Sequence, residues 1–192
     1  MKQRCAWAPE DDAFYVKYHD TEWGVPVHDD KLLFEFFILE GFQAGLSWIT
    51  ILRKRENFKI AFDDFDFLKI SRYDEKKITA LMENRKIIRN RVKIKAAVSN
   101  ARAFLKVIEQ FGSFDSYIWR FVDGKTIINK WEKSSDVPVN TAISDKMSKD
   151  LKSRGFKFVG STICYAHMQA TGMVNDHTLN CFRYDEINKM LL

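Results

Sequence analysis

Four residues of this chain have the side chains of a zinc site: Cys5, His19, His177 and Cys181. His177 and Cys181 are four residues apart, so on a helix they would share one face, while the other two would come from the N-terminal segment. Two thiolates and two imidazoles fill a tetrahedral shell and leave no open position for a catalytic water. Such a site would be structural and would join the two chain ends when metal is bound. From the residues alone, the alternative is two free cysteines and two surface histidines.

Glu40 is a second candidate, because it lies at the end of one of the most apolar runs of the chain, residues 32–39. A carboxylate in such surroundings loses hydration worth several kcal/mol unless a partner compensates. Ring faces attract positive charge and a carboxylate accepts N–H groups, so a carboxylate among rings suits a flat, cationic heteroaromatic ligand. The rings that could accompany it are Trp7, Tyr18, Trp23 and Trp48. Alternatively, the rings belong to the core and Glu40 pairs with a lysine or arginine.

A third candidate is the short segment from Gly155 to Gly160, between two predicted helices. A glycine at the start of a helix exposes backbone N–H groups that bind phosphate, and the helix dipole assists. The basic residues Lys152, Arg154 and Lys157 surround this point. The segment therefore suits a phosphate backbone, although taken by itself the pattern is also that of an ordinary turn.

The composition is compatible with a nucleic-acid partner and sets limits on other classes. The 192 residues can form one large domain or two small ones, with a core that needs no disulfides. Three widely separated cysteines argue against a secreted disulfide framework and favour a reducing, cytoplasmic setting. A net charge of +5 suits phosphates, since basic side chains release their counterions. No stretch approaches the roughly 18 apolar residues of a membrane span, so we expect no membrane partner.

The elements that must position these residues are predicted to be almost all helical, which gives an all-α fold class. Residues 1–27 show little periodicity but many rings, and we expect a packed arm. Asp29 or Asp30 can cap the apolar helix that follows, and Gly41 is expected to end it.

The rest of the chain continues this helical pattern. Ser47 is a plausible cap for a helix through Phe62, in which residues 53–55 are expected to face solvent. Asp74 can cap a short helix, and residues 90–111 have the clearest helical period, ended by Gly112. The further predicted segments are a short helix at 114–121, an extended piece at 126–131, a loop at 134–140, and helices at about 144–153 and 160–172. No linker separates two domains.

Several motifs occur together along the chain. They are RCAWA (4–8), YHDTEWGVP (18–26), LEGFQAGLSW (39–48), ILRKRENF (51–58), RGFKFVGSTICYAHMQATGMVNDH (154–177) and the terminal Cys181. These motifs closely resemble those of the bacterial 3-methyladenine DNA glycosylases of type I, in the same order and over nearly the whole chain. The resemblance implies a helix-hairpin-helix fold over residues 1–192, with two helical lobes around a base-binding pocket and chain ends joined through one structural zinc ion.

The resemblance also implies an activity and roles for particular residues. The activity is hydrolysis of the glycosidic bond of N3-methyladenine in double-stranded alkylated DNA, which releases free 3-methyladenine. The implied zinc ligands are Cys5, His19, His177 and Cys181; the implied base-recognising and catalytic carboxylate is Glu40. Tyr18 and Trp48 would hold the methylated base, with Trp7 and Trp23 nearby. Leu46, beside Gly45, would probe the gap left by the extruded nucleotide, and Lys157, Gly160 and Ser161 would hold the DNA backbone.

Two departures from the wider helix-hairpin-helix pattern matter. Phe158 stands where a glycine is usual, so the hairpin would grip phosphate less fully. Asn175 stands where a catalytic aspartate is expected, and Asp176 follows it beside a zinc ligand. A strong general base is therefore not expected. The substrate tolerates this, because N3-methylation makes adenine a cationic and good leaving group. No lysine suggests itself as a Schiff-base nucleophile, so we expect a monofunctional enzyme without strand cleavage.

Two other function classes are open at this point. A non-catalytic DNA-binding relative would keep the zinc and the hairpin but lose the pocket, and Glu40, Tyr18 and Trp48 speak against it. A zinc hydrolase would need an open metal position, which a saturated four-ligand shell would exclude. We expect the protein to act as a monomer in the cytoplasm.

Overall fold

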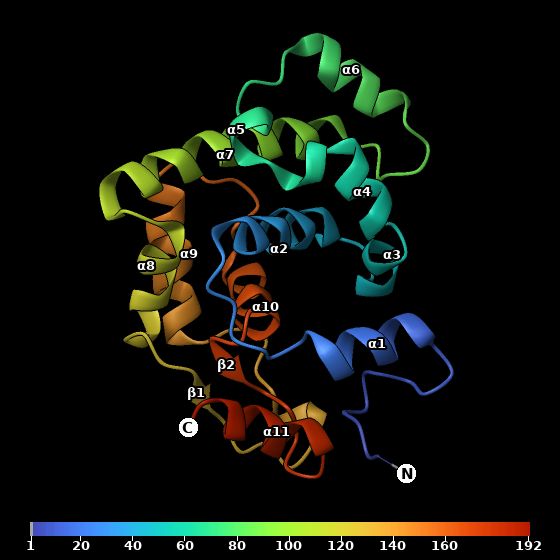
Figure 1. Ribbon diagram of the computed structural model, residues 1–192, viewed down its shortest axis with the longest axis vertical. Coiled ribbons are helices and arrows are strands. Elements are labelled where there is room, and N and C mark those ends of the chain that lie inside the picture. Colours follow the sequence, from blue (N-terminus) through green and yellow to red (C-terminus); the bar gives the residue numbers. More distant parts are fainter. Residues whose placement is uncertain (1) are drawn as a thin grey trace.

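The computed structural model describes residues 2–192, and the chain is mostly helical (Figure 1). Two helices lie at its centre, α2 (Asp30–Gln43) and α10 (Ser161–Ala170), and they contact each other. Among residues 2–192, no helix combines the length and the hydropathy needed to cross a membrane.

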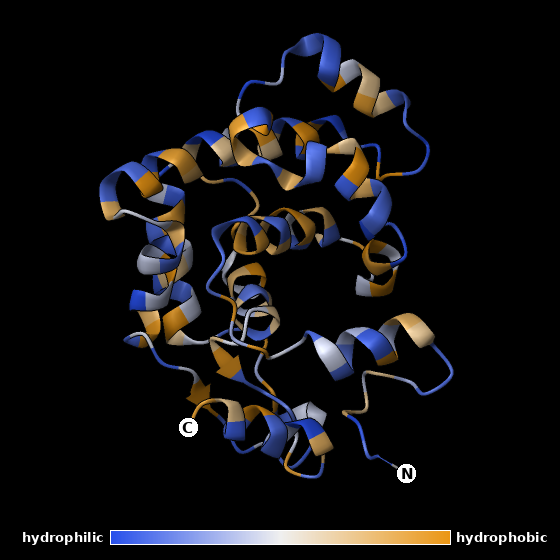
Figure 2. Cartoon of the chain, viewed as in Figure 1, coloured by the Kyte–Doolittle hydropathy of each residue, from blue (hydrophilic) through white to orange (hydrophobic). Residues whose placement is uncertain are grey.

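Helix α2 is buried on nearly every side, as its apolar sequence predicts. Its N-cap is Asp29, whose carboxylate accepts a hydrogen bond from the Leu32 backbone N–H at 2.8 Å. Most residues of α2 are hydrophobic, with a few hydrophilic ones between them (Figure 2). A carboxylate on this helix, Glu40, is thereby carried into the interior.

The upper part of the molecule in Figure 1 is formed by the helices that follow α2. They are α3 (Trp48–Leu52), α4 (Arg55–Ala61), a 3₁₀ turn (Asp63–Phe65), α5 (Phe67–Ile70), α6 (Glu75–Glu83) and α7 (Arg91–Phe111). Helix α7 follows its prediction closely, because the Asn90 side chain caps its start and Gly112, with a φ of 84°, ends it. Asp74 caps α6 as predicted.

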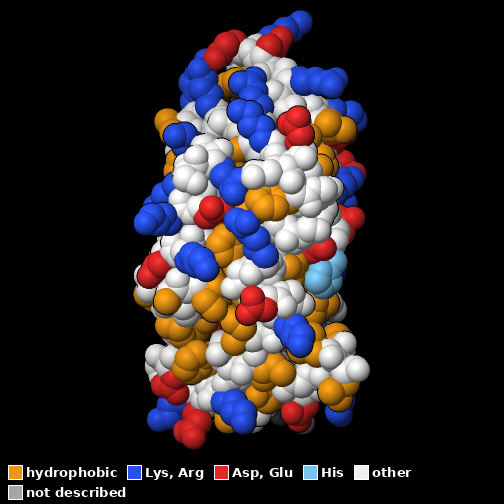
Figure 3. Space-filling model, turned by 90° about the vertical axis from the view of Figure 1, so that its left-hand side faces the viewer, with side chains coloured by type: hydrophobic (Ala, Val, Ile, Leu, Met, Phe, Trp, Pro, Cys, Tyr) orange, Lys and Arg blue, Asp and Glu red, His pale blue; other side chains and the backbone are white. Residues whose placement is uncertain are grey.

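Helices α7, α8 and α9 line the left side of the molecule in Figure 1. The elements after α7 are α8 (Phe114–Trp119), 3₁₀ turns (Arg120–Val122 and Ser134–Asp136), β1 (Ile127–Ile128) and α9 (Ala142–Ser153). Lys and Arg side chains are scattered over this side of the surface among hydrophobic ones (Figure 3). The positive charge of the chain is therefore spread widely over this face.

The two chain ends meet at the lower end of the molecule (Figure 1). Helix α1 (Ala13–Thr21) comes from the N-terminal arm, and β2 (Val174–Asn175) and α11 (Phe182–Met190) come from the other end. The Phe182 backbone N–H donates to the Gln3 carbonyl at 2.9 Å. Strands β1 and β2 pair in parallel over two residues, so the extended piece predicted at 126–131 is present and the fold is not strictly all-α.

Two predicted helix boundaries are wrong. Gly41 does not end α2, which continues to Gln43, because a single glycine lowers helix propensity without stopping the hydrogen-bond ladder. The predicted helix from Trp48 to Phe62 is broken into α3 and α4 at residues 53–54. The break brings Arg55, which was expected to face solvent, into ion pairs with Glu22 and Glu35.

His177 and Cys181 do not share a helical face, which is the arrangement that their spacing would give on a helix. His177 lies in the loop after β2, and Cys181 is the N-cap residue of α11. The N-terminal arm, for which no helix was predicted, contains α1, capped by the Asp12 side chain. The four ligands therefore come from the N-terminal arm, helix α1, the loop after β2 and the start of α11.

Candidate metal centre and base pocket

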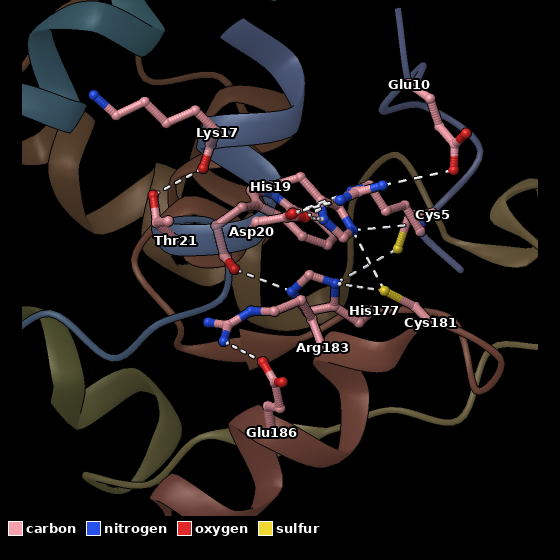
Figure 4. Close-up of polar contacts among 12 residues, drawn as sticks. Cys5, Glu10, Lys17, His19, Asp20, Thr21, His177, Cys181, Arg183 and Glu186 are labelled. Carbon is pink, nitrogen blue, oxygen red and sulfur yellow. Dashed lines mark hydrogen bonds and ion pairs between the residues drawn. The ribbon is translucent and has the colours of Figure 1, made fainter. Parts of the chain in front are cut away.

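The side chains of Cys5, His19, His177 and Cys181 converge in the interior (Figure 4). Their ligand atoms all lie within 4.8 Å of one another. The Sγ atom of Cys181 is 3.4 Å from His19 Nε2 and 3.5 Å from His177 Nδ1, and Cys5 Sγ is also 3.5 Å from His177 Nδ1. A tetrahedral zinc ion requires about 3.6 Å between sulfur and nitrogen ligands, so these donors fit a zinc ion.

The groups around the cluster orient the two imidazoles. The outer nitrogen of His19, Nδ1, lies 2.8 Å from Asp20 Oδ1, and the outer nitrogen of His177, Nε2, lies 3.0 Å from the Trp23 carbonyl. Such partners direct the remaining ring nitrogen toward a metal. Arg4 donates to the same Asp20 carboxylate. Burial raises the pKa of Asp20, but hydrogen bonds from Arg4 and His19 outweigh it and the net shift is downward.

The two thiols of the cluster shift each other's pKa in opposite directions. Their mutual hydrogen bond, followed by burial, raises the pKa of Cys5. The same hydrogen bond lowers the pKa of Cys181; burial opposes this shift, while His177 and His19 reinforce it. A divalent cation binds thiols in their deprotonated form, so metal binding at this cluster would release their protons.

A pocket of about 580 Å³ adjoins this cluster. All five residues predicted to bind a base line it, namely Trp7, Tyr18, Trp23, Glu40 and Trp48. Cys5 also lines the pocket, and the Trp23 ring centroid lies 4.6 Å from that of His177. The pocket and the cluster thus share a wall.

Glu40 is 3 % exposed, and its Oε2 atom has no hydrogen-bond partner among residues 2–192. Burial raises its pKa from 4.5 to about 8. The alternative role considered for Glu40 was a core ion pair with a lysine or arginine. No such pair is present within the described residues. An unpaired buried carboxylate is unfavourable, and a ligand that donates a hydrogen bond or carries positive charge would stabilise it.

The rings of the pocket are packed against one another. Tyr18 and Trp48 have centroids 5.4 Å apart at an angle of 53°, and Trp7 meets Trp23 edge to face at 4.9 Å. Burial, followed by the nearby charge of Glu40, raises the pKa of Tyr18 well above its ordinary value of 10. The Trp48 indole N–H is buried and also lacks a partner within the described chain. The pocket therefore presents one unpaired donor and one unpaired acceptor among aromatic faces.

The residues predicted to contact DNA lie in two loops beside this pocket and at the start of α10, which begins with Ser161. Leu46 is 40 % exposed in the α2–α3 loop (residues 44–47), where Gly45 has a φ of 80°. Lys157 is exposed in the α9–α10 link (residues 154–160), and Gly160 is the N-cap residue of α10. Their contact with DNA stays a prediction.

Sequence reasoning missed part of the pocket wall. The face of α10 formed by Thr162, Tyr165, Ala166 and Gln169 lines it, and so does the loop at 134–139. Positions 162, 165, 166 and 169 follow helical spacing, so polar residues at that spacing were a usable signal.

Asp176 also lines the pocket, whereas Asn175 is buried outside it and donates to Tyr184 and Asn188. Four donors surround the Asp176 carboxylate: Asn129, Trp131, Tyr165 and Gln169, at 2.6–2.8 Å. These bonds hold the loop after β1 against α10. A carboxylate with its lone pairs so occupied is poorly placed to accept a further proton.

Comparison with known proteins places this geometry in a family. The model of the methyladenine glycosylase family matches residues 7–184. The chain is 47 % identical over 182 residues to DNA-3-methyladenine glycosylase 1 of Escherichia coli, covering 95 % of this chain and 97 % of the relative. It is 46 % identical over 181 residues to DNA-3-methyladenine glycosylase of Haemophilus influenzae, covering 94 % and 97 %.

Solved structures agree with this assignment. A crystal structure of 3-methyladenine DNA glycosylase I has a TM-score of 0.90 and 51 % identity, covering 94 % of this chain and 98 % of that one. The Staphylococcus aureus enzyme, solved to explain 3-methyladenine recognition, has a TM-score of 0.90 and 37 % identity, covering 93 % and 95 %. The chain therefore belongs to the methyladenine glycosylase family and, within it, to the bacterial 3-methyladenine DNA glycosylases of type I.

Proposed function

We propose that the protein excises N3-methyladenine from alkylated double-stranded DNA by hydrolysing the glycosidic bond of a flipped nucleotide. The observation that carries this proposal is the buried, unpartnered carboxylate of Glu40 in a pocket lined by rings. The family and its named relatives support the same reaction class. Under this proposal, α9, the α9–α10 link and α10 form a helix-hairpin-helix element that holds the DNA backbone. Residues 1–192 then act as one unit.

The pocket chemistry fits a cationic adenine. Glu40 accepts a hydrogen bond from the base and favours its positive charge, while the Trp48 N–H can donate to a ring acceptor. Stacking on Tyr18 and Trp48 adds roughly 1–3 kcal/mol per base. Normal adenine carries no positive charge and therefore gains less from Glu40.

The reaction itself needs little from the protein. Water adds to C1′ of the sugar and the bond from C1′ to N9 breaks. The bonding electrons go to the base, which leaves as neutral 3-methyladenine, and the proton of the water goes to solvent. An abasic site remains. Among residues 2–192, no lysine that could act as a Schiff-base nucleophile lines the pocket. This supports a monofunctional enzyme without strand cleavage.

We further propose that the cluster of Cys5, His19, His177 and Cys181 binds one structural zinc ion. Bound zinc would supply only a fixed cross-link, because four protein ligands complete its shell. The ligand distances and the outer partners of both histidines support this assignment. We also propose that the protein works as a monomer in the cytoplasm, where its DNA substrate lies.

The test is an excision assay with purified, zinc-loaded protein on methylated duplex DNA. Mass spectrometry should detect free 3-methyladenine, and the DNA strand should stay intact until alkaline treatment breaks it at abasic sites. Glu40→Gln is the matched variant, since it keeps the shape of the side chain and removes its charge. The proposal fails if the wild-type protein binds the duplex yet releases no 3-methyladenine.

A further inference from the structure

Two polar side chains on α7, Lys93 and Asn100, hold the two loops that the proposed function brings to DNA. They are seven residues apart and therefore lie on the same face of the helix, about 10 Å apart along its axis. Both are buried, at 8 % and 4 % exposure. Buried polar groups on a core helix need partners, and the partners of these two are backbone atoms of distant segments.

Lys93 holds the start of the α2–α3 loop. Its Nζ atom donates to the Phe42 carbonyl at 2.8 Å and to the Ala44 carbonyl at 2.5 Å. These carbonyls lie at the C-terminal end of α2, where backbone acceptors have no partner within the helix and a cation is favoured by the helix dipole. Burial lowers the pKa of Lys93. Directly beyond this point, Gly45 turns the chain and Leu46 projects to the surface.

Asn100 holds the α9–α10 link. Its amide nitrogen donates to the Lys157 carbonyl at 3.0 Å, and its amide oxygen accepts from the Lys157 backbone N–H at 2.7 Å. One side chain thus pairs with both backbone groups of a single residue. That pairing fixes the position and the orientation of the link relative to α7.

Phe158 connects the two arrangements. It has a left-handed φ of 56°, a conformation that is unfavourable for a side chain of this size and persists only where contacts hold it. It lines a small groove between α2 and α7 together with Gly41, Lys93 and Asn100. The Lys93 Nζ atom lies 6.0 Å from the Phe158 ring centroid. The residue that departs from the usual hairpin glycine therefore packs between the two anchoring side chains.

We propose that Lys93 and Asn100 are positioning residues that fix the α2–α3 loop and the α9–α10 link at a set separation, so that both meet one DNA duplex together. This inference rests on the proposed function. Neither side chain touches the base pocket, so they act through the loops alone. Loss of either would leave the base site formed and impair only engagement of DNA.

The test compares Lys93→Met with Lys95→Met, which removes the same charge from the same helix. Lys95 is half exposed and pairs with Glu75 at the surface. The probes are a duplex with an abasic-site analogue and free 3-methyladenine. Lys93→Met should weaken duplex binding at least tenfold and change free-base binding less than threefold. Lys95→Met should change neither by more than threefold, and an equal loss of duplex affinity in both variants would overturn the inference.

A double-mutant cycle separates positioning from general destabilisation. If Lys93 acts through the α2–α3 loop, Lys93→Met in a Leu46→Ala background should weaken duplex binding by less than a further threefold. If the two substitutions instead weaken duplex binding by independent factors that multiply, the positioning role is refuted. Lys93→Arg keeps donors for both carbonyls and should restore duplex affinity to within threefold of wild type.

Asn100→Ala tests the second anchor independently, with Ser99→Ala as its neighbour control. Asn100→Ala should also lose at least tenfold in duplex affinity and keep free-base binding. Among residues 2–192, the Ser99 hydroxyl donates to the Ala96 carbonyl within α7 and to no other group, so the Ser99→Ala variant should match the wild type. If wild-type protein binds the duplex but excises nothing, the proposed function fails while the binding comparison still decides the positioning role.

Discussion

The carboxyl group of Glu40 should reveal its burial in the pH dependence of stability. In the folded protein its pKa is raised to about 8, against an ordinary 4.5 in the unfolded chain. The folded state holds the proton more tightly, so this group's contribution to the free energy of unfolding falls as pH rises between these values. Glu40→Gln removes that titration. We expect the variant to match the wild type near pH 4.5 and to exceed its melting temperature above pH 8; parallel profiles would mean that Glu40 ionises normally.

The same substitution should separate base recognition from DNA binding. Glu40→Gln replaces a charged hydrogen-bond acceptor with a neutral amide, so affinity for free 3-methyladenine, which donates to that acceptor, should fall at least about tenfold, the value of one charge-assisted hydrogen bond. Affinity for undamaged duplex should stay unchanged, because Glu40 is buried in the pocket. Tryptophan fluorescence titrations measure the first quantity and gel shifts the second. Equal losses in both would make Glu40 a merely structural residue.

His167 is a buried residue that sequence reasoning did not single out. Neither ring nitrogen has a hydrogen-bond partner in the described part of the chain, and the ring meets Phe37 edge to face at 5.3 Å. Burial lowers its pKa from 6.5 to about 3. The folded state therefore excludes a proton that the unfolded chain binds, and stability is lost as pH falls below 6.5.

His167→Phe should remove this acid sensitivity. The linkage predicts that the free energy of unfolding of the wild type falls by about 2 kcal/mol between neutral pH and pH 5. The variant should not show this loss. Urea denaturation at several pH values measures it. A variant of the surface residue His28 controls for the removal of an imidazole. If His167→Phe and wild type lose stability equally on acidification, the imidazole is not kept neutral by burial.

At the scale of elements, signals close together in the sequence predicted most helices. Contacts with distant segments caused departures from those predictions. Helix α7 could be predicted because its cap, Asn90, and its stop, Gly112, lie next to it in sequence. The break between α3 and α4 could not, because it accompanies ion pairs of Arg55 with residues far back in the chain. The end of α2 was missed for a different reason, because a single glycine lowers helix propensity without stopping the helix, and α2 continues past Gly41 to Gln43.

Alanine substitutions at two glycines, Gly41 and Gly172, should change the stability of the protein in opposite directions. At Gly41, inside α2, an added Cβ meets only ordinary contact, so Gly41→Ala should stabilise the helix by about 0.5–1 kcal/mol. At Gly172, with a φ of 69°, an added Cβ would lie 2.4 Å from the backbone at Val25 and Pro26. Gly172→Ala should therefore lower the melting temperature, and thermal melts of both variants decide. Destabilisation by Gly41→Ala would mean that the α9–α10 link cannot accommodate the methyl group.

At the scale of the whole molecule, residue types predicted the site better than spacing did. The four metal ligands and five pocket residues are chemically distinctive, and the fold brings each set together. The elements that carry the ligands were not predictable, because His177 comes from a loop and Cys181 from a helix cap. The loop at 134–139 and the carboxylate of Asp176 join the pocket through contacts between distant segments, which no local pattern encodes.

Metal removal should loosen the molecule as a whole. The cluster ties Cys5 and His19, near one end of the chain, to His177 and Cys181, near the other. A strong chelator should lower the melting temperature by about 10 °C or more, since ligation of a structural zinc is worth many kcal/mol and each kcal/mol shifts a domain of this size by about 2–4 °C. Metal analysis should find one zinc ion per chain.

Chelation should also weaken base binding, because the tethered arm carries Trp7 and Tyr18 into the pocket. Cys181→Ser should reproduce both effects without chelator. Cys164→Ser is the matched control: Cys164 is equally buried but lies outside the cluster, with its Sγ near the Val159 carbonyl, so its variant should keep the metal and respond to chelator as the wild type does. A melting curve indifferent to chelator would remove the zinc assignment. Free-base binding that survives chelation with a lowered melting temperature would show instead that packing alone holds the arm to the pocket.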